Sequence, residues 1–522
     1  MKIKEEIITR ASSEISIVDV IENEIPGELK KRGTHYVCCC PFHNERTPSF
    51  HVFPGTNTYK CFGGCGKYGD PITFIMEYRT MDFPSAVTYL IKNFDKTTDV
   101  SQIYEDLSPD KMEEYRRKET MYIYMKMACE FYRAQYEADN EEAAFCRSYA
   151  QDDSDVNGLA SANHGRWPVE IANSYCFGYA PKNGYAFVEW AKAKGLHLDI
   201  LKEIGLVAED DRHPGRYYDV FRNRLMIPQR TNAERIVTFT ARLFDAKKGD
   251  NKYINTKDSL IYTKGNMLFG LDVARKPSKE TGKMYLLEGA PDVLRLHSLD
   301  IRNAVACLGG NWTAAQLSLL SAYNPTLCFI PDEDVPKEGE KNGQGVKNVM
   351  RGGRIAVKQG FKVNVRSIPT DGSKKEDADS YLTDMNRWND MSEQDFILWY
   401  AEKVYDTEAP REEKLAAIDD ICDILVYVEP KLQASLLQDL SERYKQPKIW
   451  KQGLVDASHR LQEQKHKKAQ RESGEDLAAY RFYRTGKHYY GIDKNGHEIE
   501  WTNFIIKPLF LIDDEARPTR IF

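Results

Sequence analysis

The sequence Cys40-Pro-Phe-His43, followed after seventeen residues by Cys61-Phe-Gly-Gly-Cys65, decides the fold of the N-terminal part of this chain. It supplies three thiolates and one imidazole in two clusters, which is the ligand set and the pairing that close a four-coordinate structural zinc site. The predicted Zn²⁺ ligands are Cys40, His43, Cys61 and Cys65. Two neighbours, Cys38 and Cys39, remain alternatives to Cys40 as the first ligand.

Length and composition indicate a large protein without a membrane segment. The 522 residues are enough for three to five domains, and a hydrophobic content of 41% can bury ordinary cores. No apolar run reaches membrane-spanning length, and the N-terminus, which begins Met1-Lys-Ile-Lys, lacks the apolar segment of a secretory signal. Eleven cysteines without an evident pairing pattern agree with a reducing compartment. We therefore expect a cytoplasmic protein of a bacterial cell or a phage-infected host, with no membrane partner.

A basic segment between residues 222 and 264 stands out against the overall net charge of −6. It holds ten Lys or Arg residues against four acids, in alternating stretches such as 224–228 and 235–242 that read as short strands. Strands that present cations on one face suit a groove that follows a phosphate backbone. The alternative is a solvated, charged sheet face without a ligand.

Carboxylates follow three apolar runs farther along the chain. Residues 284–287 lead to Glu288, residues 326–331 lead to Asp332 and Asp334, and residues 361–369 lead, after a loop, to Asp377 and Asp379. The repeated order of strand and then carboxylate predicts that these acids converge on one edge of an open α/β sheet. Clustered carboxylates repel one another unless divalent cations neutralise them, and oxygen ligands suit Mg²⁺ or Mn²⁺. Any one of these acids taken alone is more typical of a strand cap or a solvated loop.

In order along the chain, these blocks resemble bacterial DnaG-type primases of phage or mobile-element kind. The resemblance covers about residues 1–400, and it is carried by Cys40 to Phe50, Tyr59 to Gly66, Phe221 to Pro228, Lys252 to Asn255, Tyr262 to Gly270, and Glu288-Gly289 followed by Asp332-Glu333-Asp334. Three departures are visible. Three residues instead of two separate the last two cysteines, Thr240-Ala-Arg242 replaces a Gly-Gly-Arg of many members, and Glu333 stands where a Gly is usual.

The resemblance implies roles for individual residues. Glu288 would be the acid or base of nucleotidyl transfer, and Asp292, one helical turn later, would support the site. The implied Mg²⁺ or Mn²⁺ ligands are Glu288, Asp332, Asp334, Asp377 and Asp379. The residues implied to hold template or nucleoside triphosphate are Arg222, Arg224, Arg242, Lys252, Tyr253, Asn255 and Lys264.

The expected architecture is a multidomain protein of α/β and α+β parts. The expected parts are a zinc-ribbon domain (1–97), a linker (98–120), a basic N-terminal subdomain of the primase core (121–272), a Toprim α/β sheet (273–400), a helical region (405–470) and a small β module (471–522). The β module carries a hairpin signal at Asp493 to Gly496, and its aromatic residues are candidates for stacking on bases.

The function that we predict is RNA primer synthesis by a DNA primase during DNA replication. It implies a single-stranded DNA template, nucleoside triphosphates, structural Zn²⁺ and a replicative helicase partner. No P-loop motif occurs in the sequence, so the helicase would act in trans, or be fused if this chain is the front part of a longer primase-helicase. The alternatives are a Toprim nuclease or topoisomerase-like enzyme and a non-catalytic single-stranded-DNA-binding helicase loader.

Overall fold

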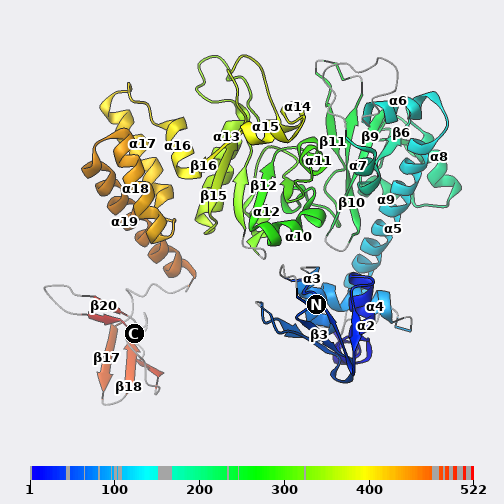
Figure 1. Cartoon of the computed structure of the whole chain (residues 1–522), viewed down its shortest axis with the longest axis horizontal. Helices are drawn as coiled ribbons and strands as arrows, with labels where there is room; N and C mark the ends of the chain where they lie inside the picture. The colour runs from blue at the N-terminus through cyan, green and yellow to red at the C-terminus, as the bar shows by residue number, and fades with distance from the viewer. Residues whose placement is uncertain are drawn as a thin grey trace. The chain divides into compact units, whose positions relative to one another are not determined.

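The structure is a computed structural model of the 522-residue chain (Figure 1). It describes residues 3–42, 47–63, 65–79, 81, 83–95, 97–98, 103, 109–150, 167–231, 234–244, 246–247, 249–321 and 325–472, and the backbone of the strands 481–485, 488–492, 498–502, 510–512 and 519–521. The chain divides into two compact units. The first holds residues 1–406 with 427–432, and the second holds residues 407–426 with 433–522.

The N-terminal domain of the first unit is an antiparallel sheet in the order β1-β2-β3-β4-β5. Its elements are α1 (Glu5–Thr9), η1 (Arg10–Glu14), α2 (Ile17–Glu24), β1 (Lys30–Arg32), β2 (His35–Cys38), β3 (Phe50–Phe53), η2 (Pro54–Thr56), β4 (Thr58–Cys61), β5 (Tyr68–Gly69), α3 (Pro71–Tyr78) and α4 (Phe83–Phe94). Alternate residues of β3 and β4, such as Phe50 and Tyr59, are buried and pack against Phe74 of α3. Asp70 caps α3 by accepting the N–H of Thr73 at 2.8 Å, which fixes where the helix begins.

The basic subdomain places a long helix against a four-stranded antiparallel sheet in the order β11-β10-β9-β6. Its elements are α5 (Pro109–Glu137), α6 (Glu141–Ala150), α7 (Val169–Ser174), β6 (Gly178–Ala180), α8 (Ala186–Ala193), α9 (Leu198–Glu203), β7 (Val207–Glu209), β8 (Tyr217–Asp219), β9 (Arg224–Arg230), β10 (Ile236–Leu243), β11 (Tyr253–Asn255) and η4 (Lys264–Asn266). Gly178 lets α5 approach closely, because a Cβ there would lie 2.6 Å from the Cβ of Tyr132.

Helix α5 differs from the expected linker over 98–120, since residues 109–120 already belong to it. The polar composition of its first turns is typical of a linker. Apolar residues at helical spacing, Met121, Met125, Ala128 and Tyr132, are buried against the subdomain and extend the helix over 29 residues.

The next domain is an α/β sheet in the order β13-β12-β14-β15-β16, in which the first four strands are parallel and β16 is antiparallel. Its elements are α10 (Leu271–Thr281), β12 (Lys283–Leu287), α11 (Ala290–Ser298), β13 (Ala304–Ala306), α12 (Ala314–Ser318), β14 (Thr326–Phe329), α13 (Gln344–Lys358), β15 (Val363–Ser367), α14 (Ala378–Tyr381), α15 (Met385–Asp390), β16 (Ser392–Asp395) and α16 (Phe396–Val404). Strands β12, β13 and β14 are mainly apolar and mostly buried, as expected of strands covered on both faces.

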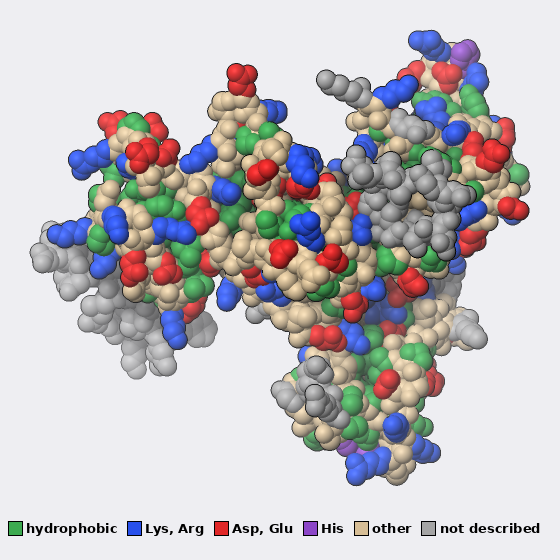
Figure 2. Space-filling view, turned by 45° about the horizontal axis from the view of Figure 1, so that its top comes forward, with side chains coloured by type: hydrophobic (Ala, Val, Ile, Leu, Met, Phe, Trp, Pro, Cys, Tyr) green, Lys and Arg blue, Asp and Glu red, His purple; other side chains and the backbone are tan. Residues whose placement is uncertain are grey.

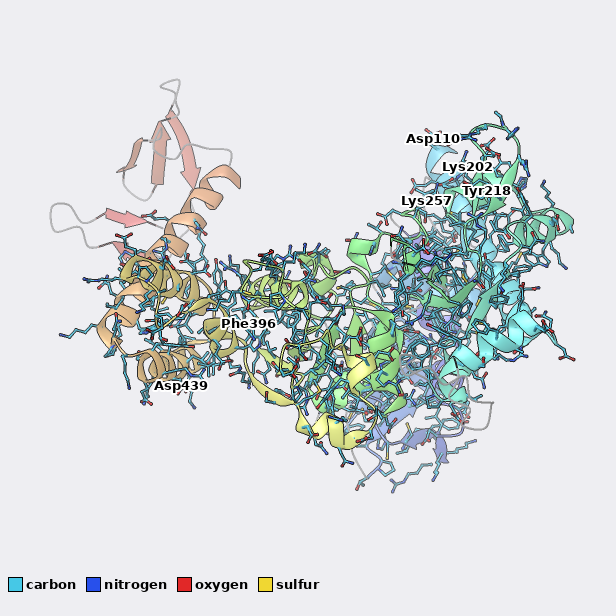
Figure 3. The ribbon with its side chains drawn as sticks, turned by 90° about the horizontal axis from the view of Figure 1, so that it is seen from above. Asp110, Lys202, Tyr218, Lys257, Phe396 and Asp439 are labelled. Atoms are coloured by element: carbon cyan, nitrogen blue, oxygen red, sulfur yellow. The ribbon has the colours of Figure 1, made fainter. Side chains whose placement is uncertain are left out.

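Helices α13 and α16 pack closely at one point of this domain. A Cβ on Gly353 of α13 would lie 2.1 Å from the ring of Phe396, which begins α16 and is labelled in Figure 3. The absence of a side chain at residue 353 therefore sets the distance between these helices.

The described residues of the second unit form helices followed by short strands. They are α17 (Arg411–Leu425), α18 (Pro430–Tyr444), α19 (Pro447–Glu472), β17 (Arg481–Thr485), β18 (His488–Ile492), β19 (Glu498–Thr502), β20 (Phe510–Ile512) and β21 (Thr519–Ile521). Helices α17 and α19 pack together around Ile418 and Trp450, which are buried. Strands β17, β18 and β19 form an antiparallel sheet. The predicted turn at Asp493 to Gly496 and the side chains expected to stack on bases lie outside the described residues.

The described helices include none with the length and apolar content needed to cross a bilayer. Figure 2 shows Lys and Arg side chains interspersed with Asp and Glu over the face in view. Charges of both signs are thus mixed on that face, and local arrangements decide where an anion can bind.

Candidate active site

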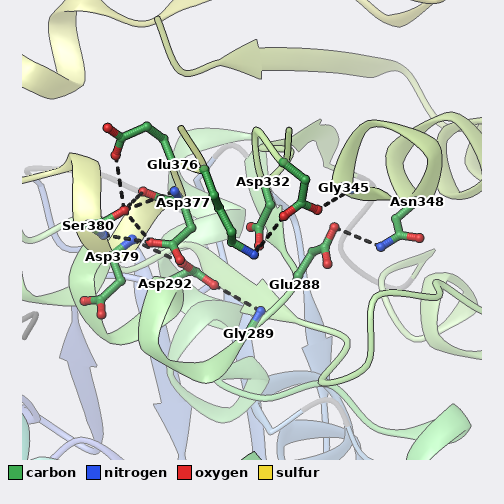
Figure 4. Close-up of polar contacts among 12 residues, drawn as sticks. Glu288, Gly289, Asp292, Asp332, Gly345, Asn348, Glu376, Asp377, Asp379 and Ser380 are labelled. Atoms are coloured by element: carbon green, nitrogen blue, oxygen red, sulfur yellow. Dashed lines mark hydrogen bonds and ion pairs between the residues drawn. The ribbon is translucent and has the colours of Figure 1, made fainter. Parts of the chain in front are cut away.

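The predicted carboxylates lie at the C-terminal ends of three neighbouring parallel strands. Glu288 follows β12, Asp332 and Asp334 follow β14, and the loop after β15 leads to Asp377 and Asp379. Figure 4 shows Glu288, Asp332 and Asp377 around one region at the sheet edge, with the carboxyl group of Asp379 pointing away from them. The order of the strands therefore gathers residues that are far apart in the sequence.

Glu288 is a half-buried acid whose side chain accepts a hydrogen bond and has acidic neighbours. Its Oε1 accepts a hydrogen bond from Asn348 Nδ2 at 3.0 Å. Burial, followed by the negative charge of Asp332, raises the pKa of Glu288 to about 7. The carboxyl group can therefore either hold or release a proton near neutral pH.

Asp292 joins two helix N-termini instead of facing an open space. Its Oδ2 accepts the N–H of Gly289 at 3.1 Å, and its Oδ1 accepts the N–H of Asp379 at 3.1 Å. Burial, followed by the charge of Asp332, raises its pKa well above the ordinary value. The side chain ties the start of α11 to the start of α14 (Figure 4).

Asp332 and Asp334 lie side by side, and both form an ion pair with the ammonium group of Lys375. Lys375 Nζ is 3.2 Å from Asp332 Oδ2 and 2.9 Å from Asp334 Oδ1. Burial raises the pKa of Asp332 to about 6, although Lys375 opposes this shift. The N–H of Gly345, in the first turn of α13, donates to Asp334 Oδ2 at 2.9 Å. A helix N-terminus and a lysine thus both favour the ionised pair.

Asp377 and Asp379 have different surroundings although they are two residues apart. Asp377 caps α14, because its Oδ1 accepts the N–H and the hydroxyl of Ser380 at 2.8 and 2.7 Å. Asp379 lies 3.4 Å from Arg295 Nε, and burial raises its pKa to about 6 against the effect of that arginine. Its Oδ1 is buried, and it is the oxygen that lies 3.4 Å from Arg295 Nε.

The donor set of this edge fits a hard divalent cation. Its donors are the carboxylate oxygens that follow β12, β14 and β15, and carboxylate oxygen is the ligand type that Mg²⁺ and Mn²⁺ prefer. Within the described part of the chain, no three of these carboxylates have oxygen atoms that all lie within 4.8 Å of one another. A cation bound here would therefore take several of its ligands from water or from a phosphate.

Three of the predicted basic residues lie beside the carboxylates. Arg242 is buried on β10 between the rings of Tyr149 and Tyr253, 5.1 and 5.2 Å from their centroids, and it interacts electrostatically with Asp379. Burial, followed by the charge of Arg242, lowers the pKa of Lys252, which also interacts with Asp379.

Lys264 approaches the same edge from η4. A Cβ on Gly309 would lie 2.9 Å from Lys264 Nζ, and a Cβ on Gly310 would lie 3.3 Å from Glu288 Oε2. Lys264 thus lies over the glycine pair that borders Glu288. The missing side chains leave room for both the lysine and the acid.

The other predicted phosphate-binding residues are engaged within the protein. The guanidinium of Arg224 donates to the backbone oxygens of Ala241, Asn251 and Lys252, so it stabilises the connection between β10 and β11. The other three residues contact neighbouring side chains. Arg222 lies over the ring of Tyr218 at 5.5 Å, Tyr253 bonds to Arg242 through its hydroxyl, and Asn255 accepts a hydrogen bond from Thr240 at 2.8 Å.

The sequence reasoning missed four residues of this edge, which are Arg295, Gly345, Asn348 and Lys375. Lys375 carried a usable signal, because it precedes Asp377 by two residues and an extended chain places such residues on one face. Nothing in the sequence sets Arg295, Gly345 or Asn348 apart from other helix residues.

The N-terminal domain brings three of the four predicted zinc ligands together. The Sγ atoms of Cys40, Cys61 and Cys65 lie within 4.8 Å of one another, and those of Cys40 and Cys65 are 3.6 Å apart. Two thiolates on one tetrahedral Zn²⁺ lie about 3.8 Å apart, so the thiols fit this metal. Cys38 and Cys39 are not in the cluster, and His43 lies outside the described residues.

Comparison with known families matches three consecutive parts of the chain. The CHC2 zinc finger matches residues 3–106, the N-terminal domain of the DNA primase catalytic core matches residues 165–275, and the Toprim-like domain matches residues 285–382. The matches therefore cover the zinc domain, the basic subdomain and the sheet that carries the carboxylates.

Curated relatives and solved structures agree with these matches. A DNA primase of Aquifex aeolicus is 34% identical over 62% of this chain and 57% of its own length, and one of Pseudomonas putida is 32% identical over 61% and 45%. The chain thus spans about half the length of these relatives. The crystal structure of the zinc-binding and RNA polymerase domains of the Aquifex aeolicus primase matches with a TM-score of 0.51 and 28% identity, over 85% of this chain and 98% of that one. A DNA primase domain from Pseudomonas aeruginosa shares the fold, with a TM-score of 0.51, 23% identity and coverage of 64% and 99%.

Proposed function

We propose, from the premise that the chain belongs to the DnaG-type primase family, that it synthesises short RNA primers on single-stranded DNA from nucleoside triphosphates. One observation carries the proposal. Arg242 and Lys252 interact electrostatically with Asp379, and Lys264 lies over the glycine pair that borders Glu288, so a triphosphate and a divalent cation can meet at the edge where β12, β14 and β15 end. A zinc domain by itself, or a basic sheet by itself, would not bring these groups together.

The reaction is attack of a ribonucleotide 3′-hydroxyl on the α-phosphate of a second triphosphate, with release of pyrophosphate. The proton of the attacking hydroxyl passes to Glu288, whose raised pKa suits a group that gains and loses a proton near neutral pH. Arg242, Lys252 and Lys264 hold and orient the phosphates, which accounts for much of the catalysis in phosphoryl transfer. A divalent cation held by Asp332, Asp334, Asp377 and Asp379 would offset the charge on the phosphate oxygens. We propose Mg²⁺ as this cation, with Mn²⁺ able to replace it.

The zinc domain supplies the template contact in this proposal. Phe62 and Tyr68 are 60% and 74% exposed. Lys60 lies 5.2 Å from the ring centroid of Phe62, and His51 packs edge-on against that ring at 4.9 Å. Exposed aromatic rings with a nearby cation are the features on which unpaired bases stack. Zn²⁺ held by Cys40, His43, Cys61 and Cys65 would keep this small domain folded.

A replicative helicase, in trans or fused, stays the predicted protein partner, and the cytoplasm stays the predicted site of action. A phage or mobile-element origin also stays a prediction. The predicted domain boundaries are kept as proposals, with the linker ending where α5 begins at Pro109.

The test is primer synthesis on single-stranded DNA with labelled nucleoside triphosphates and Mg²⁺ or Mn²⁺. We expect short RNA products from the intact chain and at least a hundredfold loss with Asp332→Ala. Asp371→Ala is the matched control, because that aspartate is exposed in the loop before Asp377 and contacts none of the carboxylates. Cleavage of the labelled DNA would indicate the nuclease alternative. DNA binding without synthesis or cleavage in either protein would indicate the helicase loader.

A further inference from the structure

Lys375 provides a tethered cation for the carboxylate pair that follows β14. Its Nζ lies 3.2 Å from Asp332 Oδ2 and 2.9 Å from Asp334 Oδ1. The two aspartate side chains are largely buried, whereas 54% of the lysine side chain is exposed. The ammonium group thus reaches the pair from the solvent side, and it neutralises about half of the charge that the pair carries when ionised.

The backbone fixes this contact. Glu333 and Glu376 form an antiparallel bridge with two hydrogen bonds, of 2.8 and 3.1 Å between their N–H and C=O groups. The bridge places Lys375 opposite Asp334 and Asp377 opposite Asp332. Because side chains alternate along an extended chain, these four side chains share one face and Glu333 lies on the other. The lysine therefore lies next to the aspartates through the register of two paired segments, and not through a free choice of side-chain rotamer.

We propose that Lys375 is a built-in counter-cation that competes with the divalent metal for Asp332 and Asp334 and so sets the affinity of the free protein for that metal. The inference rests on the proposed function, in which these aspartates bind the metal. A divalent cation and the ammonium group need the same two oxygens, so binding of one releases the other. The released ammonium becomes available to a phosphate oxygen of the incoming triphosphate. Metal and nucleotide then bind more tightly together than apart.

The size of the effect follows from the two ion pairs. Partly exposed pairs of this kind each contribute up to about a fivefold effect on an equilibrium constant. Loss of both ion pairs, partly offset by the better hydration of the released ammonium group, changes the metal-binding constant by about tenfold. Removing Lys375 is therefore expected to tighten metal binding by about tenfold in the absence of nucleotide.

The neighbouring Lys374 is a matched control. It belongs to the same loop and carries the same charge, but its Nζ pairs with Glu376 at 2.7 Å and 76% of its side chain is exposed. Removing it changes the net charge by the same amount without freeing the aspartates. A difference between the two lysines therefore separates the specific contact from a general change in the field of the domain.

The experiment measures Mn²⁺ binding to the full, zinc-loaded chain by the electron paramagnetic resonance signal of free Mn²⁺. The proteins compared are the unmodified chain, Lys375→Met, Lys374→Met and Asp334→Asn. We expect Lys375→Met to bind Mn²⁺ about tenfold more tightly, Lys374→Met to differ by less than twofold, and Asp334→Asn to lose this binding. Lys375→Gln serves as a second variant with a polar side chain.

A nucleotide arm adds an independent readout. With a non-hydrolysable nucleoside triphosphate present, we expect the advantage of Lys375→Met in Mn²⁺ affinity to disappear, since the ammonium would then contact phosphate. Equal or weaker Mn²⁺ binding by Lys375→Met without nucleotide would overturn the inference and leave the proposed function intact. Absence of saturable Mn²⁺ binding in every protein would overturn the metal site of the proposed function, and this inference with it.

Discussion

Gly345→Ala is a severe test of how the first turn of α13 positions Asp334. A Cβ on Gly345 would lie 2.2 Å from the carbonyl oxygen of Asp332, whereas an ordinary contact is 3.4 to 4 Å. The clashing atom belongs to the backbone, so no side-chain rotation relieves it. The start of the helix must move by about 1 Å or more. That movement breaks the 2.9 Å hydrogen bond from the Gly345 N–H to Asp334 Oδ2.

Opposing effects set the magnitude of the change. Alanine is the better helix former by about 1 kcal/mol, which alone would stabilise the protein. Overpacking costs about 1–3 kcal/mol, and loss of a hydrogen bond to a charged group costs about 1.5–3 kcal/mol. The steric and hydrogen-bond costs exceed the gain in helix propensity. We therefore expect the free energy of unfolding to fall by about 2–4 kcal/mol, with at least a tenfold loss of primer synthesis.

The assays are urea unfolding followed by circular dichroism and primer synthesis at saturating template. Gly55→Ala is the control, because nothing lies within 4 Å of a Cβ at that glycine, and we expect a change of less than about 0.5 kcal/mol. If Gly345→Ala were as stable and as active as the unmodified chain, the close contact between α13 and the residues after β14 would be refuted.

Three further predictions concern other parts of the first unit. Burial lowers the pKa of His297 to about 4 in the folded protein, whereas the value in the unfolded chain is about 6.5. The free energy of unfolding should therefore be highest above pH 6.5 and lower by about 1.4 kcal/mol at pH 5.5. Melting temperature against pH should show this slope in the unmodified chain and a flatter curve in His297→Gln; parallel curves would contradict it. Metal analysis should find one Zn²⁺ per chain. Cys61→Ser should lose the metal and Cys39→Ser should keep it, because Cys61 belongs to the thiol cluster and Cys39 does not. Equal zinc contents in the two variants would exclude the site. Arg242→Lys should lower kcat/KM for primer synthesis about tenfold, because a lysine cannot match the planar cation between two tyrosine rings. The exposed Arg212→Lys should have no effect, and equal losses in both would argue against a role for Arg242.

The sequence predicts the carboxylate edge well because two simple rules apply there. A buried parallel strand reads as an apolar run, and its C-terminal end is where Glu288 or Asp332 emerges. The basic segment is less predictable, because an arginine beside a strand can bind phosphate or hold a neighbouring loop. Arg242 interacts electrostatically with Asp379, whereas Arg224, in the same sequence pattern, donates hydrogen bonds to backbone carbonyl oxygens. Which outcome occurs depends on the path of the loop that follows β10, and local composition does not encode that path.

The double hydrogen bond of Asp292 has a consequence for how the chain matures during synthesis. Its two backbone partners are Gly289, three residues away, and Asp379, which is 87 residues farther along the chain. A nascent chain that ends before residue 379 has the Gly289 N–H but lacks the Asp379 N–H, so Asp292 Oδ1 has no backbone donor. The last partner leaves the ribosome only after β14, α13 and β15 have been translated. A chain that ends before residue 379 therefore lacks both Asp379 and the bond that joins the start of α14 to the start of α11, so the carboxylate edge is assembled only late in synthesis.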